Sequence, residues 1–327
     1  MAGASKRVIY AALAGNTLIA ITKFAAAVYT GSSAMLSEGI HSVVDTGNQV
    51  LLLHGLKRAR QPASKEFPFG HGKEVYFWSF VVAILIFAVG GGVSAYEGIK
   101  HMLHPQAIHN PTMNYIVLGL AMLFEGGSWS VALREFNKTK GDLGYLEAVH
   151  RGKDPTMFVV LFEDSAAMLG LIVAFVGIVL SQITGNPVFD GLASVVIGLI
   201  LCGTAVWLAI ETKGLLIGEA ANRDVVAGIR EIAAGSPSVE KVNEVLTMHM
   251  GPDFILANIS IDFRDNLETG EVERAVAQLD RTIKSRYGIV KRIFIEAESA
   301  VAPPGSSDPD TAQAPPHAPQ GGGVTPS

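Results

Sequence analysis

The chain has 327 residues, a net charge of −5 at pH 7, a mean hydropathy of +0.35 and only 17% charged residues. So apolar a composition excludes an ordinary soluble protein of this length and indicates a polytopic membrane protein. The single cysteine, Cys202, excludes an intrachain disulfide and a cysteine-based zinc site. The charge balance gives no indication of a nucleic-acid partner.

Six segments qualify as membrane spans, because a spanning helix needs about 20 mostly apolar residues. In chain order they are residues 8–29, 35–57, 76–97, 113–133, 157–181 and 188–210. The first follows a short polar start with no small-residue cleavage site, so we interpret it as a membrane helix rather than a signal peptide. An even number of spans places both termini on one side of the membrane.

Basic residues predict which side that is. They gather in the loop between spans two and three and in the loop between spans four and five: Lys57, Arg58, Arg60, Lys65 and Lys73, then Arg134, Lys138, Lys140, Arg151 and Lys153. The positive-inside rule therefore predicts cytosolic termini, or the equivalent side of an organelle membrane. Composition and the absence of an evident transit peptide favour a prokaryotic inner membrane.

Residues 211–299 have the pattern of a small soluble α/β domain, which follows a transmembrane domain at 1–210. Helices are expected near 224–234 and through the apolar stripe Val272, Val276, Leu279 and Ile283, and strands near 239–250, 254–263 and 290–296. The order α-β-β-α-β suits an open sheet with helices on one face. Residues 300–327, rich in Pro, Gly and Ser, are expected to be disordered.

The second span carries His41 and Asp45, two metal-binding side chains in an apolar segment. Four residues apart on a helix, they lie one above the other on the same face. An ionisable residue at bilayer depth costs roughly 2.5 to 3.5 kcal/mol on insertion scales, so this pair indicates a transported ion or proton. A hydrogen-bonded structural histidine is the plainer alternative.

The fifth span carries a second acidic pair, Glu163 and Asp164. Adjacent helical residues point about 100° apart, so one is expected to bind metal and the other to support it or to carry protons. We assign Asp164 as the ligand that meets His41 and Asp45. Imidazole and carboxylate ligands suit Zn²⁺, with Mn²⁺, Fe²⁺ or Co²⁺ as alternatives, and disfavour Cu(I).

Four further ionisable residues have weaker signals. Lys23 is expected to pair with a carboxylate and Glu38 to lie near the outer interface, both in structural roles. Glu125 is a candidate fourth ligand or proton carrier. His71 lies among turn residues in the loop after span two, and its spacing alone does not identify a metal site.

Two motifs give the chain a family resemblance. His41-Ser42-Val43-Val44-Asp45 is similar to the span-two HxxxD-type metal motif of the cation diffusion facilitators, and Phe69-Gly70-His71-Gly72-Lys73 to their FGHGK loop. The similarity covers roughly residues 5–298. It implies six spans with a cytosolic ferredoxin-like domain, and a homodimeric exporter of Zn²⁺ or a related ion that exchanges metal for protons by alternating access.

The resemblance also implies a transport site shared with an (H/D)xxxD pair in span five. Asp164 matches the second member of that pair, but Val160 stands at the first, which leaves the site one ligand short. Water, Glu163 or Glu125 would complete it. The Glu163-Asp164 pair resembles a divergent branch of the family, which contains member nine of the animal zinc transporters.

The accessory metal sites of the family are reduced in this sequence. In the loop only His71 remains, and Phe67 occupies the place of a second histidine. In the soluble domain, Asn243 and Asn258 align with histidines. We therefore expect the soluble domain to serve dimerisation more than metal sensing.

Two other functions stay open. The missing span-five ligand suggests a non-transporting regulatory or scaffold protein of the same fold. An intramembrane metal-dependent hydrolase has little support, because the sequence lacks a nucleophile motif. We expect a secondary transporter with a metal cargo and no resident cofactor, rather than an enzyme.

Overall fold

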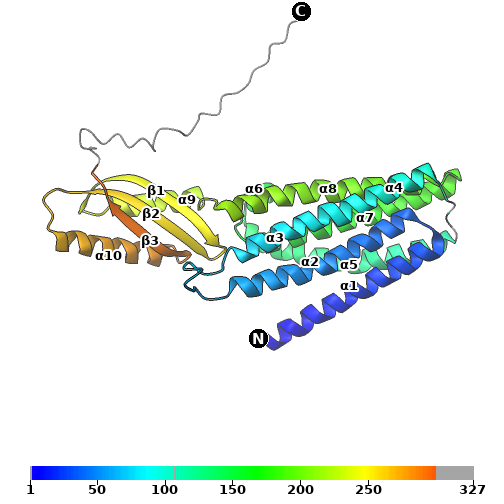
Figure 1. Ribbon diagram of the computed structural model, residues 1–327, viewed down its shortest axis with the longest axis horizontal. Coiled ribbons are helices and arrows are strands. Elements are labelled where there is room, and N and C mark those ends of the chain that lie inside the picture. The colour runs from blue at the N-terminus through cyan, green and yellow to red at the C-terminus, as the bar shows by residue number, and fades with distance from the viewer. Residues whose placement is uncertain (1, 107, 109, 300–327) are drawn as a thin grey trace, which may run out of the picture.

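The computed structural model describes residues 2–106, 108 and 110–299 of the chain. A long helical bundle carries a small α/β domain at one end (Figure 1). The expected disordered tail, residues 300–327, lies outside the described residues.

The bundle is made mainly of long helices. Its elements are α1 (Ala2–Thr30), α2 (Ser33–Ala59), α3 (Glu74–Leu85), the π-helix η1 (Ile86–Gly92), α4 (Val93–Leu103), α5 (Pro111–Lys140), α6 (Tyr145–Arg151), α7 (Pro155–Thr184) and α8 (Val188–Ile217). The elements α3, η1 and α4 follow one another without a break and form one rod. Because the helices extend beyond their apolar centres, they are longer than the expected spans, and α8 continues to Ile217.

Four of the helices described are long and apolar enough to cross a membrane. They cover Glu74–Leu103, Pro111–Lys138, Phe158–Thr184 and Val188–Ile217. Six spans were expected from the sequence. Although α2 has the length of a span, Glu38, His41 and Asp45 lower its hydropathy.

The start of α1 and the soluble domain lie at the same end of the bundle (Figure 1). The connection from α2 to α3 and the region of α6, which hold most of the basic loop residues, lie at this end too. The short turns between α1 and α2 and between α7 and α8 lie at the opposite end. We call these the domain end and the far end of the bundle.

Glycines bring the α3–η1–α4 rod into backbone contact with α8. A Cβ added at Gly98 would lie 2.6 Å from the nitrogen of Val195 and 2.7 Å from the oxygen of Gly191. One at Gly198 would lie 2.8 Å from the oxygen of Gly91. Small residues allow this approach because membrane helices associate through close packing rather than through the hydrophobic effect.

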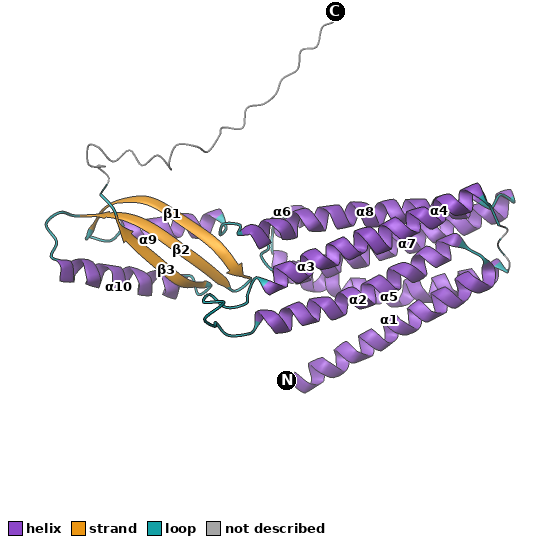
Figure 2. Ribbon diagram, viewed as in Figure 1, coloured by secondary structure: helices purple, strands orange, loops and turns teal. Residues whose placement is uncertain are grey.

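The soluble domain has the predicted order of elements (Figure 2). They are α9 (Arg223–Ala234), β1 (Val239–Gly251), β2 (Phe254–Phe263), α10 (Thr269–Arg286) and β3 (Val290–Ala297). In the sheet, β2 is central, antiparallel to β1 and parallel to β3. Alternate residues of β2 are buried together with Leu279 and Ile283 of α10, as the period-two and helical patterns require.

Several contacts join the soluble domain to the bundle, and two of them are close. A Cβ added at Gly72, in the loop after α2, would lie 2.3 Å from the oxygen of Met250, so only glycine fits there without a shift. Beside α6, Lys153 Nζ lies 2.6 Å from Glu219 Oε1. These contacts fix the domain against the helix ends.

Candidate metal centre

Helix α2 places His41 and Asp45 together, as their spacing predicts. The Nδ1 atom of His41 lies 3.3 Å from Oδ1 of Asp45, and the imidazole is 1% exposed. Neither imidazole nitrogen, nor that Asp45 oxygen, has a hydrogen-bond partner among the described residues. Buried polar atoms are normally hydrogen-bonded, so buried atoms without a partner are unusual. The imidazole nitrogens and this Asp45 oxygen are therefore candidates to bind a ligand.

Helix α7 sends its two acids in different directions, as the 100° rotation between neighbours requires. Glu163 is buried and accepts a hydrogen bond from Nδ2 of Asn48, on α2, at 2.6 Å. Asp164 instead accepts a hydrogen bond from Oγ of Ser128 on α5 at 3.3 Å. Glu163 therefore faces α2 through Asn48, and Asp164 turns toward α5.

A small cavity of about 30 Å³ joins these elements, enough for one ion or water molecule. Its lining comes from α1, α2, α5 and α7: Asn16, Ile19, Ser42, Asp45, Gln49, Glu125, Ser128, Asp164 and Ala167. Asp164 thus faces the same space as Asp45. Within the described part of the chain, no three His, Cys, Asp or Glu side chains are close enough to hold an ion together. The ligand groups surround the cavity without closing on it.

A buried lysine lies next to this cavity. The Nζ atom of Lys23 donates hydrogen bonds to Glu38 at 3.1 Å, Ser42 at 2.9 Å and Glu125 at 2.7 Å. The expected pairing of Lys23 with a carboxylate is confirmed. Glu38 is fully buried within the bundle, where it pairs with Lys23.

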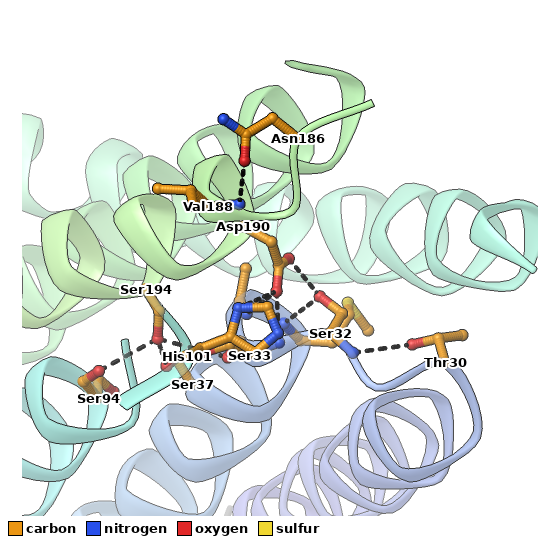
Figure 3. A network of polar contacts seen from close by, with 12 residues as sticks. Thr30, Ser32, Ser33, Ser37, Ser94, His101, Asn186, Val188, Asp190 and Ser194 are labelled. Carbon is orange, nitrogen blue, oxygen red and sulfur yellow. Dashed lines mark hydrogen bonds and ion pairs between the residues drawn. The ribbon is translucent and has the colours of Figure 1, made fainter. Parts of the chain in front are cut away.

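At the far end of the bundle, a carboxylate from α8 caps α2. Asp190 accepts hydrogen bonds from the Oγ of Ser32 at 2.6 Å and the backbone nitrogen of Ser33 at 2.5 Å (Figure 3). His101 of α4 lies beside it, with Nδ1 3.9 Å from Oδ2. A carboxylate at a helix N-terminus satisfies free N–H groups and the helix dipole. Asp190 therefore anchors the helix that carries His41 and Asp45.

His71 takes no part in that cavity. Its ring packs against Phe67, with centroids 4.5 Å apart, and its Nδ1 lies 3.8 Å from Oε1 of Glu74. A separate cavity of about 570 Å³, between this loop and the soluble domain, is lined by His71, Asp154 and Asp253 among others. These contacts give His71 a local packing role in the loop.

Sequence reasoning missed Asn48, which holds Glu163 toward α2. The signal was present, because Asn48 lies seven residues after His41 and three after Asp45, on the same helix face. A polar residue that continues a stripe of two candidate ligands is itself a candidate for the site. Val160, at the expected fourth ligand position, packs against the apolar core instead.

Comparison with known proteins shows the family of the chain. The family described as the cation efflux transmembrane domain matches residues 9–217. The chain belongs to the cation efflux family. This membership confirms the resemblance to the cation diffusion facilitators that the two motifs suggested, and it covers the helices that carry His41, Asp45, Glu163 and Asp164.

Relatives within the cation efflux family are similar over most of the chain. The proton-coupled zinc antiporter SLC30A9, mitochondrial, is 34% identical in Xenopus laevis and 33% in Homo sapiens, each over 266 residues. That alignment covers 80% of this chain and 47% of each relative. Metal tolerance protein C4 of Arabidopsis thaliana is 30% identical over 265 residues, 80% of this chain and 58% of that protein. The chain thus spans about half the length of these relatives.

The comparisons correct the expected location. A prokaryotic inner membrane was predicted from composition and from the absence of an evident transit peptide. That prediction is wrong, because the frog and human relatives are mitochondrial by name. Composition reports that a chain lies in a membrane but does not distinguish between membranes of similar thickness.

Proposed function

We propose that the chain carries divalent metal cations, Zn²⁺ foremost, across a membrane in exchange for protons by alternating access. The observation that carries this proposal is the small cavity that Asp45, Asp164 and Glu125 line together, beside the buried imidazole of His41, whose nitrogens have no hydrogen-bond partner among the described residues. Carboxylates gathered around one small buried space repel one another unless a proton or a cation lies between them. Such a cluster is suited to exchange protons for a metal cation.

The proposed ligands are His41, Asp45, Asp164 and Glu163. Neutral imidazole and ionised carboxylates bind metal, so loading releases protons and protonation expels the ion. Nitrogen and oxygen ligands of this kind suit Zn²⁺ and leave Mn²⁺, Fe²⁺ and Co²⁺ as competing cargoes. The names of the frog and human relatives, proton-coupled zinc antiporters, support the same reading.

The wider organisation belongs to the same proposal. The six long rods, counting α3 to α4 as one, would all cross the membrane, with the domain end on the side of the basic loops. The soluble domain would be ferredoxin-like and join two chains into a homodimer. The names of the relatives favour a mitochondrial membrane.

Transport into proteoliposomes tests the proposal. The purified chain should take up Zn²⁺ when the vesicle interior is acid, and Asp45→Ala should abolish uptake. Asp142→Ala, which removes an exposed carboxylate after α5, is the matched control and should transport normally. Unchanged uptake in Asp45→Ala would refute the assignment. Competition by Mn²⁺, Fe²⁺ and Co²⁺ in the same assay ranks the cargoes.

One observation favours a second candidate, a non-transporting regulatory or scaffold protein. The ligand groups of the described residues are gathered around the cavity without three of them closing on one point. A protein of this second kind would neither move Zn²⁺ nor bind it at micromolar concentration by calorimetry. Binding without transport would support a metal-responsive regulator instead.

A further inference from the structure

The ammonium group of Lys23 uses all of its hydrogen-bond donors within the bundle. It has three N–H donors, and each one meets an acceptor: Glu38, Ser42 and Glu125. Lys23 and Glu38 are both 0% exposed. A buried ammonium is stable only when it is paired and hydrogen-bonded, so this lysine requires at least one carboxylate at all times.

Glu125 is bonded to Lys23 and also lines the cavity. Its Oε1 accepts the shortest of the three bonds from Lys23, at 2.7 Å, while its Oε2 is buried with no hydrogen-bond partner among the described residues. The side chain is 16% exposed and lines the cavity that Asp45 and Asp164 also line. One carboxylate oxygen is thus held by an internal cation, and Glu125 borders the space that a transported cation would enter.

We propose that Glu125 is exchanged between Lys23 and the transported cation, so that Lys23 is an internal cation that competes with the cargo. This inference rests on the proposed function, which it deepens. Lys23 is a positioning residue, because it acts on the metal through Glu125 and touches no metal itself. Without a bound cation, the Glu125 carboxylate is bonded to Lys23. When a divalent cation binds in the cavity, the Glu125 carboxylate turns toward that cation.

The second carboxylate makes the exchange possible. When Glu125 turns to the metal, Lys23 keeps Glu38, so no buried charge is left alone. When the metal leaves, Glu125 returns to Lys23 rather than remaining as an unpaired carboxylate. Glu38 is therefore the permanent partner, and the more exposed Glu125 the exchangeable one.

Two substitutions test the competition because they should act in opposite directions. Lys23→Met removes the competitor and should tighten Zn²⁺ binding about tenfold while slowing transport, since release loses its driving partner. Glu38→Gln leaves Lys23 with Glu125 as its only carboxylate and should weaken Zn²⁺ binding by a similar factor. Calorimetry on the full chain in detergent gives the affinities, and proteoliposomes loaded with acid buffer give the rates.

Two further variants complete the design. Glu125→Gln should weaken binding and, combined with Lys23→Met, should cancel the gain of that change. Lys138→Met, which removes an exposed lysine from the same helix as Glu125, should leave affinity unchanged. If Lys23→Met does not fold, Glu38→Gln and Lys138→Met still decide. Glu38→Gln should weaken Zn²⁺ binding while Lys138→Met should not, and an unchanged affinity in Glu38→Gln would overturn the exchange.

A purely structural role for Lys23 would give a different result. Lys23→Met and Glu38→Gln would then shift Zn²⁺ affinity in the same direction or not at all, which overturns the exchange. If wild-type protein still takes up Zn²⁺ and Asp45→Ala does not, the proposed function survives that result. Absence of binding and uptake in the wild type would overturn both.

Discussion

Asp190 offers the sharpest test of how the far end of the bundle supports the metal centre. The change Asp190→Ala removes the carboxylate that α8 presents to the first residues of α2. The hydroxyl of Ser32 and the backbone N–H of Ser33 would lose their acceptor in a buried setting. Asp190→Asn is the matched variant, because its amide oxygen can still accept one of these bonds.

The distances set the size of the effect. The bonds of 2.6 Å and 2.5 Å are short and charge-assisted, whereas that from the nitrogen of Ala34, at 3.4 Å, contributes little. A hydrogen bond to a charged group contributes about 1.5 to 3 kcal/mol, so two of them give about 3 to 6 kcal/mol. Relief of the buried charge offsets part of this, which leaves about 3 kcal/mol for Asp190→Ala and about 1 kcal/mol for Asp190→Asn.

Thermal unfolding in detergent measures this order. Wild type should unfold at the highest temperature, Asp190→Asn slightly lower and Asp190→Ala lowest. Because the cap holds the helix of His41 and Asp45, Zn²⁺ affinity should fall in the same order. The reasoning fails if Asp190→Ala is as stable as wild type, since the two short bonds would then carry no net free energy.

Two other predictions concern packing and pH. Gly98→Ala places a methyl group 2.6 Å from the nitrogen of Val195, so the yield of folded protein recovered from detergent should drop sharply. Gly119→Ala, where no described atom lies within 4 Å of the added methyl group, should fold normally. Equal recovery of the two variants would contradict the packing argument. In the soluble domain, burial lowers the pKa of His249 below its ordinary value of 6.5. The folded state therefore disfavours the proton, so the stability of the domain should be full above pH 6.5 and decline as the pH falls below it. Hydrogen exchange of β1 in the full chain at pH 7.5 and pH 5.5 measures this, and His249→Gln should remove the His249 contribution to the difference.

The elements of the soluble domain were predictable because their signals are local. Strand β2 alternates buried and half-buried residues along Phe254–Phe263, and α10 repeats apolar residues at helical spacing. The rods of the bundle were predictable for the same reason, although their ends lie beyond the apolar centres. What the sequence did not reveal is the mixed sheet, in which β3 lies parallel to β2, because strand direction depends on the path of α10.

The location could not be derived from composition. The hydrocarbon core of every bilayer requires apolar side chains in the segments that span it. Hydropathy therefore does not distinguish a protein of a prokaryotic membrane from one of a mitochondrial membrane. The word mitochondrial is part of the names of the frog and human relatives, and it is the basis on which a prokaryotic inner membrane was set aside.

The sequence by itself determined the pair His41 and Asp45, because four residues on one helix fix their common face whatever the surroundings. Only the tertiary structure decided that Glu163 of α7 bonds to Asn48 of α2 while Asp164 turns to Ser128 of α5, since the rotation of α7 depends on its neighbours. It also decided that Lys23 and Glu125, 102 residues apart, form an ion pair beside the cavity. The bilayer core offers no water to solvate these charges, so the fold brings them together.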